Sequence, residues 1–589
     1  MPKNGAIGGS WPVWVALVAI AVAFVLRLHD LDLRSISHPE VYVPGIPLPP
    51  GISVPPPRLT LGEVIAMHYH DEPHPMGWYV AMFGWTRVAG VSEWALRFPG
   101  AALGAASVWI AFLVGRRAFG PAAGALAAVL LALHGFHLFW SQVARMYAAG
   151  AFWGLVSVAL LLAFVYGERW RGWIGAFYVA SLAAGAQTIE LMWPVIGMQI
   201  LWAGLILPNS TPFRPAALWR LQFAGAHPAI QLQAVAVMLS APELLHSAYR
   251  MRPGAVEEQG LSFLGEYASF GFLFGHDFAA IPTLAIPAPA ALALFAIAAG
   301  VLIWAARLPA AEPRPVPAGA DLPRWLPVVV AVGTSALMVW MALIAHRRTE
   351  ALLVLSAGPV LALALPALVR AAEAGLRRWR GFEPWRRRVA GPRLLVFLLA
   401  VVAPAILFVL SAKVAILASR AFLVFVPFLV ILAAGSATGI ARVWPRRVAV
   451  ALLVALFAAS VPYSFEKPGS PRDYKALVAG MRRDWRAEDL VFVLDKRWEE
   501  APLFYYLPDA RYITTDHAAA LLAEPGARVW LVTWPSPFQP MIDDARRDAL
   551  AGYEKVGEVT ALRASAELFL PPAGGASGPA DRQPSASAP

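Results

Sequence analysis

Long apolar segments alternate with short polar ones along most of the chain. A membrane-spanning helix needs about 20 mainly apolar residues, and by that length we predict about thirteen crossings. They lie near 11–27, 97–115, 119–138, 146–166, 172–189, 192–207, 227–243, 284–307, 325–345, 350–370, 394–412, 420–440 and 447–463. The segment 75–91 is apolar and aromatic but short, so we expect an interfacial helix with Trp78, Tyr79 and Trp85 at headgroup level.

After residue 463 the pattern changes to that of a small soluble domain. Ser470, Pro471 and Asp473 have the order of a hydroxyl N-cap, a first-position proline and a first-turn acid, so we expect a helix to begin there. Strand-like runs at 490–494, 512–514 and 529–534 alternate with helical stretches at 499–506, 516–523 and 541–551. We therefore predict a transmembrane domain over 1–463, an α/β domain over 464–570 and a disordered, Pro- and Ser-rich tail over 571–589.

Composition and charge support the membrane class and give an orientation. The chain is 59% hydrophobic and 14% charged, which is typical of a polytopic membrane protein. Its net charge of +11 comes from arginines clustered between apolar segments, the positive-inside pattern, so nucleic acid is not the expected partner. We expect a multi-pass protein of the bacterial cytoplasmic membrane, with an uncleaved first span, a cytoplasmic N-terminus, and the loops 28–96 and 244–283 and the C-terminal domain outside. The lack of cysteine excludes disulfides and thiolate metal sites.

Acids and histidines are concentrated in the first outer loop. Carboxylates and imidazoles are the usual proton-transfer groups, so this concentration indicates an acid/base site at the membrane surface, or a merely solvated loop. The same side chains offer donors for a divalent cation, but their spacing matches no helical zinc motif, and we assign no metal or cofactor. The residues are His38, Glu40, Glu63, His68, His70, Asp71, Glu72 and His74.

Basic residues occur at the outer ends of several predicted spans, where positive charge is disfavoured. Such residues either anchor the helix at the interface or bind an anion, and a guanidinium can grip a lipid phosphate with two hydrogen bonds. The candidates are Arg97, Arg145 with Tyr147, Lys413 with Arg420, and the run His346, Arg347 and Arg348. For His246, His276 and Asp277 of the second outer loop we expect a surface role, the alternative being that they join the pocket for the lipid phosphate.

Four stretches resemble the GT-C superfamily of membrane glycosyltransferases, in particular bacterial members of glycosyltransferase family 39. This family includes relatives of the protein O-mannosyltransferases and of the aminoarabinose transferases that modify lipid A. The stretches are 27–31 (Arg-Leu-His-Asp-Leu) with 35–40 (Ser-Ile-Ser-His-Pro-Glu), 71–79 (Asp-Glu-Pro-His-Pro-Met-Gly-Trp-Tyr) with 93–99, 141–148 (Ser-Gln-Val-Ala-Arg-Met-Tyr-Ala), and 419–422 (Ser-Arg-Ala-Phe) with Pro427. The likeness is strongest over 11–165.

The resemblance implies a GT-C fold and transfer of a single sugar from a polyprenyl-phosphate donor to a lipid, glycan or protein acceptor, with inversion at the anomeric carbon. By position, Glu40 is the general base or its partner, and Asp71 helps to orient the acceptor or sugar or is itself the base. Glu72 and His74 are expected to bind the substrates. Arg97, Arg145, Tyr147 and Arg420 serve the donor phosphate, and Lys413, marked by its charge, is expected to join them.

The chain departs from the family pattern at three polar positions. Pro39 stands where the family has the aspartate usually assigned as base, Val143 replaces a glutamate, and Ala421 replaces a tyrosine. These departures fit a transferase with a divergent acceptor, or a protein that binds lipid-linked sugar without transferring it. A lipid-linked-sugar transporter is a further alternative, although it predicts internal repeats and charge at the membrane midplane.

Overall fold

A computed structural model of the chain describes two compact units. The first comprises Met1–His29, Val64–Met82 and Arg97–Lys467, and the second comprises Asp30–Glu63, Phe83–Leu96 and Pro468–Pro589. The described residues are 10–49, 56–70, 74–167, 172–207, 226–250, 322–323, 325–345, 356–378, 391–411, 419–466, 472–493, 501–514, 527–534 and 546–572. The predicted span 284–307, the helix at 516–523 and the tail from 573 lie outside them.

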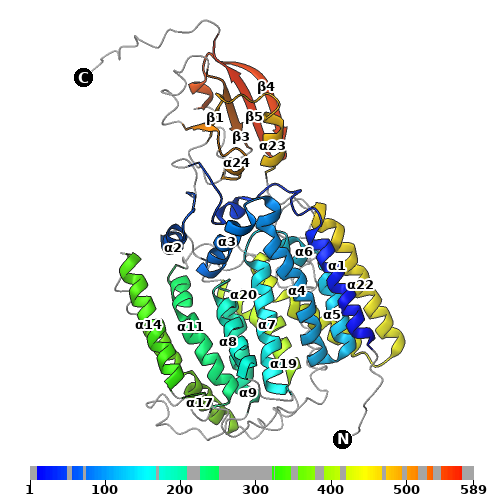
Figure 1. Cartoon of the computed structure of the whole chain (residues 1–589). Coiled ribbons are helices and arrows are strands. Elements are labelled where there is room, and N and C mark those ends of the chain that lie inside the picture. The colour runs from blue at the N-terminus through cyan, green and yellow to red at the C-terminus, as the bar shows by residue number, and fades with distance from the viewer. Residues whose placement is uncertain are drawn as a thin grey trace, which may run out of the picture. The chain divides into compact units, whose positions relative to one another are not determined.

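Helices make up most of the described chain (Figure 1). In chain order they are α1 (Trp11–Leu28), the 3₁₀ helix η1 (His38–Tyr42), α2 (Leu61–His70), α3 (Met76–Ala89), α4 (Glu93–Phe119), α5 (Pro121–Leu133), α6 (Gly135–Ser141), α7 (Tyr147–Tyr166), α8 (Gly172–Ala186), α9 (Met192–Ile206), α11 (Pro228–Arg250), α14 (Trp325–Ala345), α16 (Ala357–Ala362), α17 (Leu365–Arg377), α19 (Pro392–Phe397), the π-helical turn η3 (Leu398–Val402), α20 (Ala403–Ser411), the 3₁₀ helix η4 (Ser419–Val424), α21 (Val426–Thr438), α22 (Val443–Glu466), α23 (Tyr474–Met481) and α24 (Ala501–Tyr506).

The first unit holds helices long and apolar enough to cross a membrane. Within the described residues there are six: α1, α4, α7, α11, the continuous run from α19 to α20, and α22. The bent pair α5–α6 raises the number to seven if it forms one span, and α8, α9, α14 and α21 are shorter apolar helices. The chain is therefore a multi-pass membrane protein, and thirteen crossings stay a prediction.

The predicted span over 119–138 is wrong in one respect, because the helix breaks at His134. Helices α5 and α6 meet there at an angle of 60°. His134 caps the N-terminus of α6 by accepting a hydrogen bond from the backbone N–H of His137, and the Ser460 hydroxyl accepts one from Gly135. Side chains thus replace the helical bonds that the break removes.

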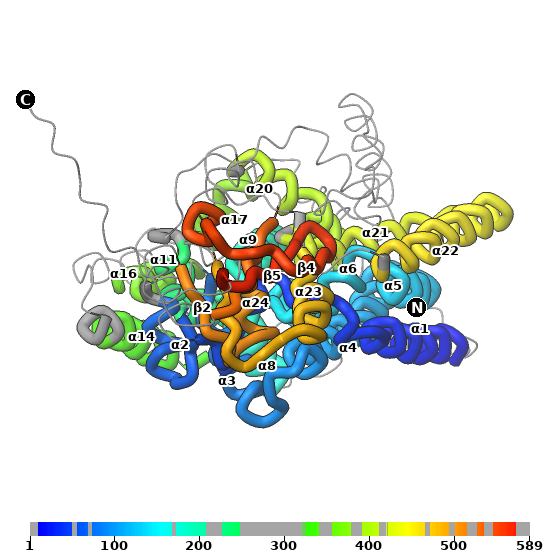
Figure 2. The backbone as a smooth tube through the Cα atoms, turned by 90° about the horizontal axis from the view of Figure 1, so that it is seen from above, coloured from blue at the N-terminus to red at the C-terminus, as the bar shows by residue number. Residues whose placement is uncertain are grey.

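Helix α5 lies in the middle of a group of helices in the first unit. It packs against α1, α21 and α22, and Figure 2 shows α5 between α1 and α22. Helix α7 packs against α8 and η4, while α11 packs against α8, α14 and α16. The 3₁₀ helix η4 is therefore held on α7, whose first residue is Tyr147.

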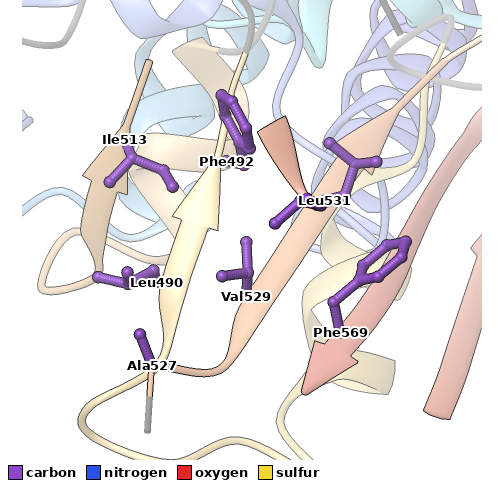
Figure 3. Packing of buried hydrophobic residues seen from close by; sticks show 8 residues of the cluster. Leu490, Phe492, Ile513, Ala527, Val529, Leu531 and Phe569 are labelled. Atoms are coloured by element: carbon purple, nitrogen blue, oxygen red, sulfur yellow. The ribbon is translucent and has the colours of Figure 1, made fainter. Parts of the chain in front are cut away.

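A five-stranded sheet forms the core of the second unit. Its strands are β1 (Leu490–Phe492), β2 (Arg511–Ile513), β3 (Val529–Thr533), β4 (Glu554–Ala561) and β5 (Ala564–Leu570), in the order β2-β1-β3-β5-β4. The first three are parallel, as expected for strands joined by helical crossovers, and β5 and β4 add an antiparallel hairpin. Figure 3 shows Leu490, Phe492, Val529, Leu531 and Phe569 packed together in the apolar core.

The start of the first helix after α22 differs from the prediction. The helix α23 begins at Tyr474, and its N-cap is Asp473 rather than Ser470. The Asp473 carboxylate accepts a hydrogen bond from the backbone N–H of Ala476 at 3.0 Å. Aspartate is as good an N-cap as serine, and the helix begins three residues later than predicted.

Candidate functional site

The motif at 141–148 is positioned by the break between α5 and α6. The Arg27 guanidinium is fully buried and donates to the carbonyl oxygens of Leu131 and Ala132, in the last turn of α5, at 3.1 and 3.2 Å. In return, the Gln142 side-chain amide donates to Leu26, Arg27 and His29 carbonyls at the end of α1. Two motif residues, Arg27 and Gln142, therefore lock the segment that precedes Arg145.

Three of the predicted donor-binding residues lie at the start of α7 or contact it. The Nε–H of Arg420, on η4, donates to the Tyr147 hydroxyl at 3.0 Å. Arg145 precedes Tyr147 by two residues, is only 5% exposed, and places its guanidinium carbon 5.7 Å from the centroid of the Tyr79 ring. Because Arg420 is exposed and Arg145 is buried, the cluster presents one solvated and one desolvated cation.

Arg97 lies on a part of α4 that approaches the same segment. Its side chain is 2% exposed. One turn further along α4, a Cβ on Gly100 would lie 2.9 Å from the Ser141 carbonyl oxygen and 3.2 Å from that of Val143. Only glycine permits this close approach, so the backbone of α4 packs directly on the turn that carries Arg145.

The structure adds a half-buried carboxylate to this region. Glu190, in the turn between α8 and α9, pairs with the Nδ1 of His74. Burial on its own raises the pKa of Glu190, but His74 and the charge on Arg145 outweigh it and hold the pKa below its ordinary value. The start of α3 is fixed to the same turn, because Trp78 donates its backbone N–H to the Gln187 carbonyl at 3.3 Å.

A further carboxylate, that of Glu243 on α11, is buried and contacts His68 and Met76, which lie on the two sides of 71–73 in the sequence. Its Oε1 lies 3.0 Å from Nε2 of His68 and accepts the backbone N–H of Met76 at 2.9 Å. His246, one turn further, stacks on His68 with ring centroids 4.3 Å apart and donates to the His68 carbonyl. His246 is 7% exposed, so the surface role expected for it is wrong.

The ionised Glu190 gives a testable pH dependence of stability. A carboxyl group with a depressed native pKa contributes stability above its unfolded pKa, about 4.3 for glutamate, and that contribution is lost as the pH falls through the native pKa. We expect Glu190→Gln to remove this dependence, so between about pH 6 and about pH 3 its melting temperature should fall less than that of the wild type. Thermal unfolding in detergent measures both. Glu488→Gln, at an exposed acid, is the control and should behave as wild type.

Glu40 lies in the second unit and is engaged in a local cap. It is 1% exposed, and its Oε2 accepts both the backbone N–H and the hydroxyl of Ser37 at 2.9 Å. This is a capping box at the start of η1. The described contacts of Glu40 are thus those of a carboxylate that holds a turn.

The remaining predicted site residues, Asp71, Glu72 and Lys413, lie outside the described residues. So do His276, Asp277, His346, Arg347 and Arg348. Across the part of the chain that the structure describes, no three His, Asp or Glu side chains are grouped closely enough to hold a metal ion.

Sequence reasoning missed two carboxylates, the half-buried Glu190 and the buried Glu243. Glu190 and Glu243 stand in otherwise apolar stretches, and an acid at that depth usually has a purpose. That signal marks them as candidates, but their partners His74 and His68 lie more than a hundred residues away in the sequence, so only the fold identifies the pairs. The interfacial helix predicted at 75–91 forms as α3, but Trp78 and Tyr79 are buried in protein, at 5% and 1% exposure.

A family model connects this region to known proteins. The model of the dolichyl-phosphate-mannose-protein mannosyltransferases matches residues 71–208, which include His74, Arg97, Arg145, Tyr147 and Glu190. The match supports the resemblance to the GT-C superfamily that the motifs indicate. No curated protein matches the chain by sequence.

Solved structures of low sequence identity align over most of the chain. ArnT from Cupriavidus metallidurans bound to undecaprenyl phosphate is 16% identical, with 95% of this chain and 98% of that chain covered and a TM-score of 0.45. The oligosaccharyltransferase AglB from Archaeoglobus fulgidus, in complex with an inhibitory peptide and a dolichol-phosphate, is 13% identical, with 95% and 74% covered and a TM-score of 0.40. The arabinofuranosyltransferase AftD from Mycobacteria is 14% identical, with 97% and 40% covered and a TM-score of 0.35.

Proposed function

From the membership of this chain in the GT-C superfamily, which its motifs and the family-model match support, we propose that it is a membrane glycosyltransferase with a lipid-linked donor. It moves one sugar from a polyprenyl phosphate to a lipid, glycan or protein acceptor at the outer face of the membrane. The residues that serve the donor phosphate are Arg97, Arg145, Tyr147, Lys413 and Arg420.

The observation that carries this proposal is the cation cluster at the start of α7. Arg420 reaches Tyr147 from a segment 273 residues away, and Arg145 belongs to the turn that leads into the helix. The N-terminus of a helix carries a partial positive charge and unpaired N–H groups, which favour a bound anion. Two guanidinium groups and this helix end together suit a phosphate, because guanidinium and backbone N–H groups both donate hydrogen bonds to phosphate oxygens.

The chemistry follows from these roles. The acceptor group loses its proton to a carboxylate and attacks the anomeric carbon of the donor, forming the new glycosidic bond. The bond between that carbon and the phosphate oxygen breaks, and its electron pair remains on the departing polyprenyl phosphate. Arg145 and Arg420 stabilise this developing charge, an effect that is stronger for the buried Arg145 because water screens it less.

We propose Asp71 as the carboxylate that takes the proton, with Glu40 as the alternative. Glu40 uses its Oε2 for two hydrogen bonds to Ser37 and is buried, which favours a structural role. Glu72 and His74 orient the acceptor or the sugar. The ion pair between His74 and Glu190 gives His74 a fixed position for this task.

Binding of the lipid phosphate alone tests the donor side of the proposal. Undecaprenyl phosphate added to the full-length protein in nanodiscs should raise its melting temperature, because a ligand that binds only the folded state stabilises it. Arg420→Gln should weaken the apparent affinity by roughly tenfold, the range for one charge-assisted hydrogen bond. Arg442→Gln, at an exposed arginine before α22, is the matched control. Equal stabilisation of Arg420→Gln and wild type would contradict the assigned phosphate site.

A further inference from the structure

A cavity within the second unit is not used by the proposed donor chemistry. Its volume is about 590 Å³, within the range of roughly 300–1,000 Å³ that is usual for small-ligand sites. The wall comes from residues 46–47 and 91–93, from α23, and from the end of α24. Its polar lining residues are Ser92, Glu93, Lys475, Arg482, Tyr505 and Tyr506.

Hydrogen bonds fix the polar side of this cavity in place. The Glu93 carboxylate pairs with the Lys475 ammonium at 2.6 Å and accepts the Tyr506 hydroxyl at 2.5 Å. The Tyr506 oxygen in turn accepts the backbone N–H of Ile36 at 2.7 Å. Tyr505 donates its hydroxyl to the Val91 carbonyl at 2.8 Å. Because these groups are already bonded to one another, a ligand would meet a preorganised wall.

One cationic side chain of the lining, that of Arg482, is not neutralised by an acidic side chain within the described part of the chain. Lys475 neutralises Glu93, whereas Arg482 donates to the backbone carbonyl of Tyr506 at 3.0 Å. Arg482 is exposed, so its planar guanidinium is open to a carboxylate or a phosphate.

The rest of the lining favours a sugar as the body of the ligand. The rings of Tyr505 and Tyr506 lie at 87° to each other, with centroids 5.0 Å apart, beside apolar Pro47, Val478 and Pro508. Aromatic rings with bonded hydroxyls present both an apolar face and polar atoms, which matches the mixed surface of a pyranose. Such a lining can cover the C–H face of a sugar while Arg482 binds its acidic group.

We propose that this cavity binds an anionic saccharide, a sugar unit that bears a carboxylate or a phosphate, as part of the acceptor. That this saccharide is an acceptor rests on the proposed glycosyltransferase function, whereas its binding to the cavity does not. The acceptor is then an acidic glycan.

Binding of defined saccharides to the full-length protein in nanodiscs tests the proposal. Digalacturonic acid should bind at least tenfold more tightly than its dimethyl ester, which keeps the sugar and removes the charge. Arg482→Gln should weaken binding of the acid by roughly tenfold or more, as expected for a lost charge-assisted contact. Ala479→Tyr, at an exposed lining position, should fill the cavity and abolish binding. Arg483→Gln, at the exposed neighbour that does not line the cavity, is the control and should bind as wild type.

Glucose 6-phosphate, measured beside the acid, identifies the preferred anion: tighter binding of either compound than of the ester supports the proposal. Equal affinity for acid and ester, or undiminished binding to Arg482→Gln and Ala479→Tyr, would overturn it, as would tighter binding of an acidic tripeptide than of either sugar. None of these variants touches Arg145, Tyr147 or Arg420. Retained binding of undecaprenyl phosphate would therefore show that only the acceptor proposal had failed.

Discussion

Replacing Arg145 with glutamine is expected to lower the rate of sugar transfer by about a hundredfold to a thousandfold, the usual effect of removing one group that stabilises transition-state charge. Arg145 is 5% exposed and lies over the Tyr79 ring, so its charge acts on the leaving phosphate with little screening by water. The loss should appear in kcat more than in KM, because the phosphate gains charge only as the glycosidic bond breaks. Single-turnover transfer in nanodiscs measures it.

Two further variants separate this role from a structural one. Arg145→Lys keeps the charge but loses the planar fork, and its rate should lie between those of wild type and Arg145→Gln. Arg442→Gln should transfer at the wild-type rate. If Arg145→Gln unfolds at a lower temperature and its kcat equals that of the wild type at temperatures where the variant is folded, Arg145 supports the fold and the assigned role is wrong.

Asp71→Asn is expected to lower transfer by about two to four orders of magnitude, the range for a lost general base. Glu40→Gln should leave the rate close to wild type. Glutamine keeps an oxygen that can accept both bonds from Ser37 and is as good as glutamate in a capping box, so this variant removes the charge and preserves the turn. The initial rates of the two variants, measured with the same donor, decide between the carboxylates.

The pair of variants has a clear contrary outcome. A rate lowered by two or more orders of magnitude in Glu40→Gln, with Asp71→Asn close to wild type, would move the base to Glu40. Glu40→Ala is the structural control. It deletes the cap and should cost about 0.5–2 kcal/mol of stability, visible as faster hydrogen exchange in η1.

The candidate site was partly readable from the sequence because motif residues lie close together in the chain. Arg145 and Tyr147 belong to one short run, and Arg420 was marked by its charge at the outer end of a predicted span; the structure joins it to Tyr147 by a hydrogen bond. The resemblance gave no role to Arg27 and Gln142, which hold the broken helix. Their partners are helix-end carbonyl oxygens, and the break at His134 lies within an apolar run that reads as a continuous span.

The strands of the sheet also differ in how well the sequence pattern predicts them. The strands β1 and β3 fall within the predicted runs because they are buried and apolar, whereas β2 begins at the exposed Arg511, one residue before its run. The edge strand β4 is mostly exposed and carries Glu554, Lys555 and Glu558, so it lacks the hydrophobic pattern of a strand. Its turn into β5 places Arg563 at a positive φ of 47°, without the glycine or asparagine that marks a hairpin.

A transfer assay with the lipid donor tests directly whether the protein is a glycosyltransferase that uses Arg145. Membranes that contain the native protein would be supplied with radiolabelled polyprenyl-phosphate sugars and a panel of lipid, glycan and protein acceptors, beside membranes with Arg145→Gln. We expect label in an acceptor fraction with the native protein and at least a hundredfold less label with the variant. Label that appears at equal rates with both would contradict the phosphate site, and undecaprenyl phosphate binding with no transfer to any acceptor would contradict the assignment as a transferase.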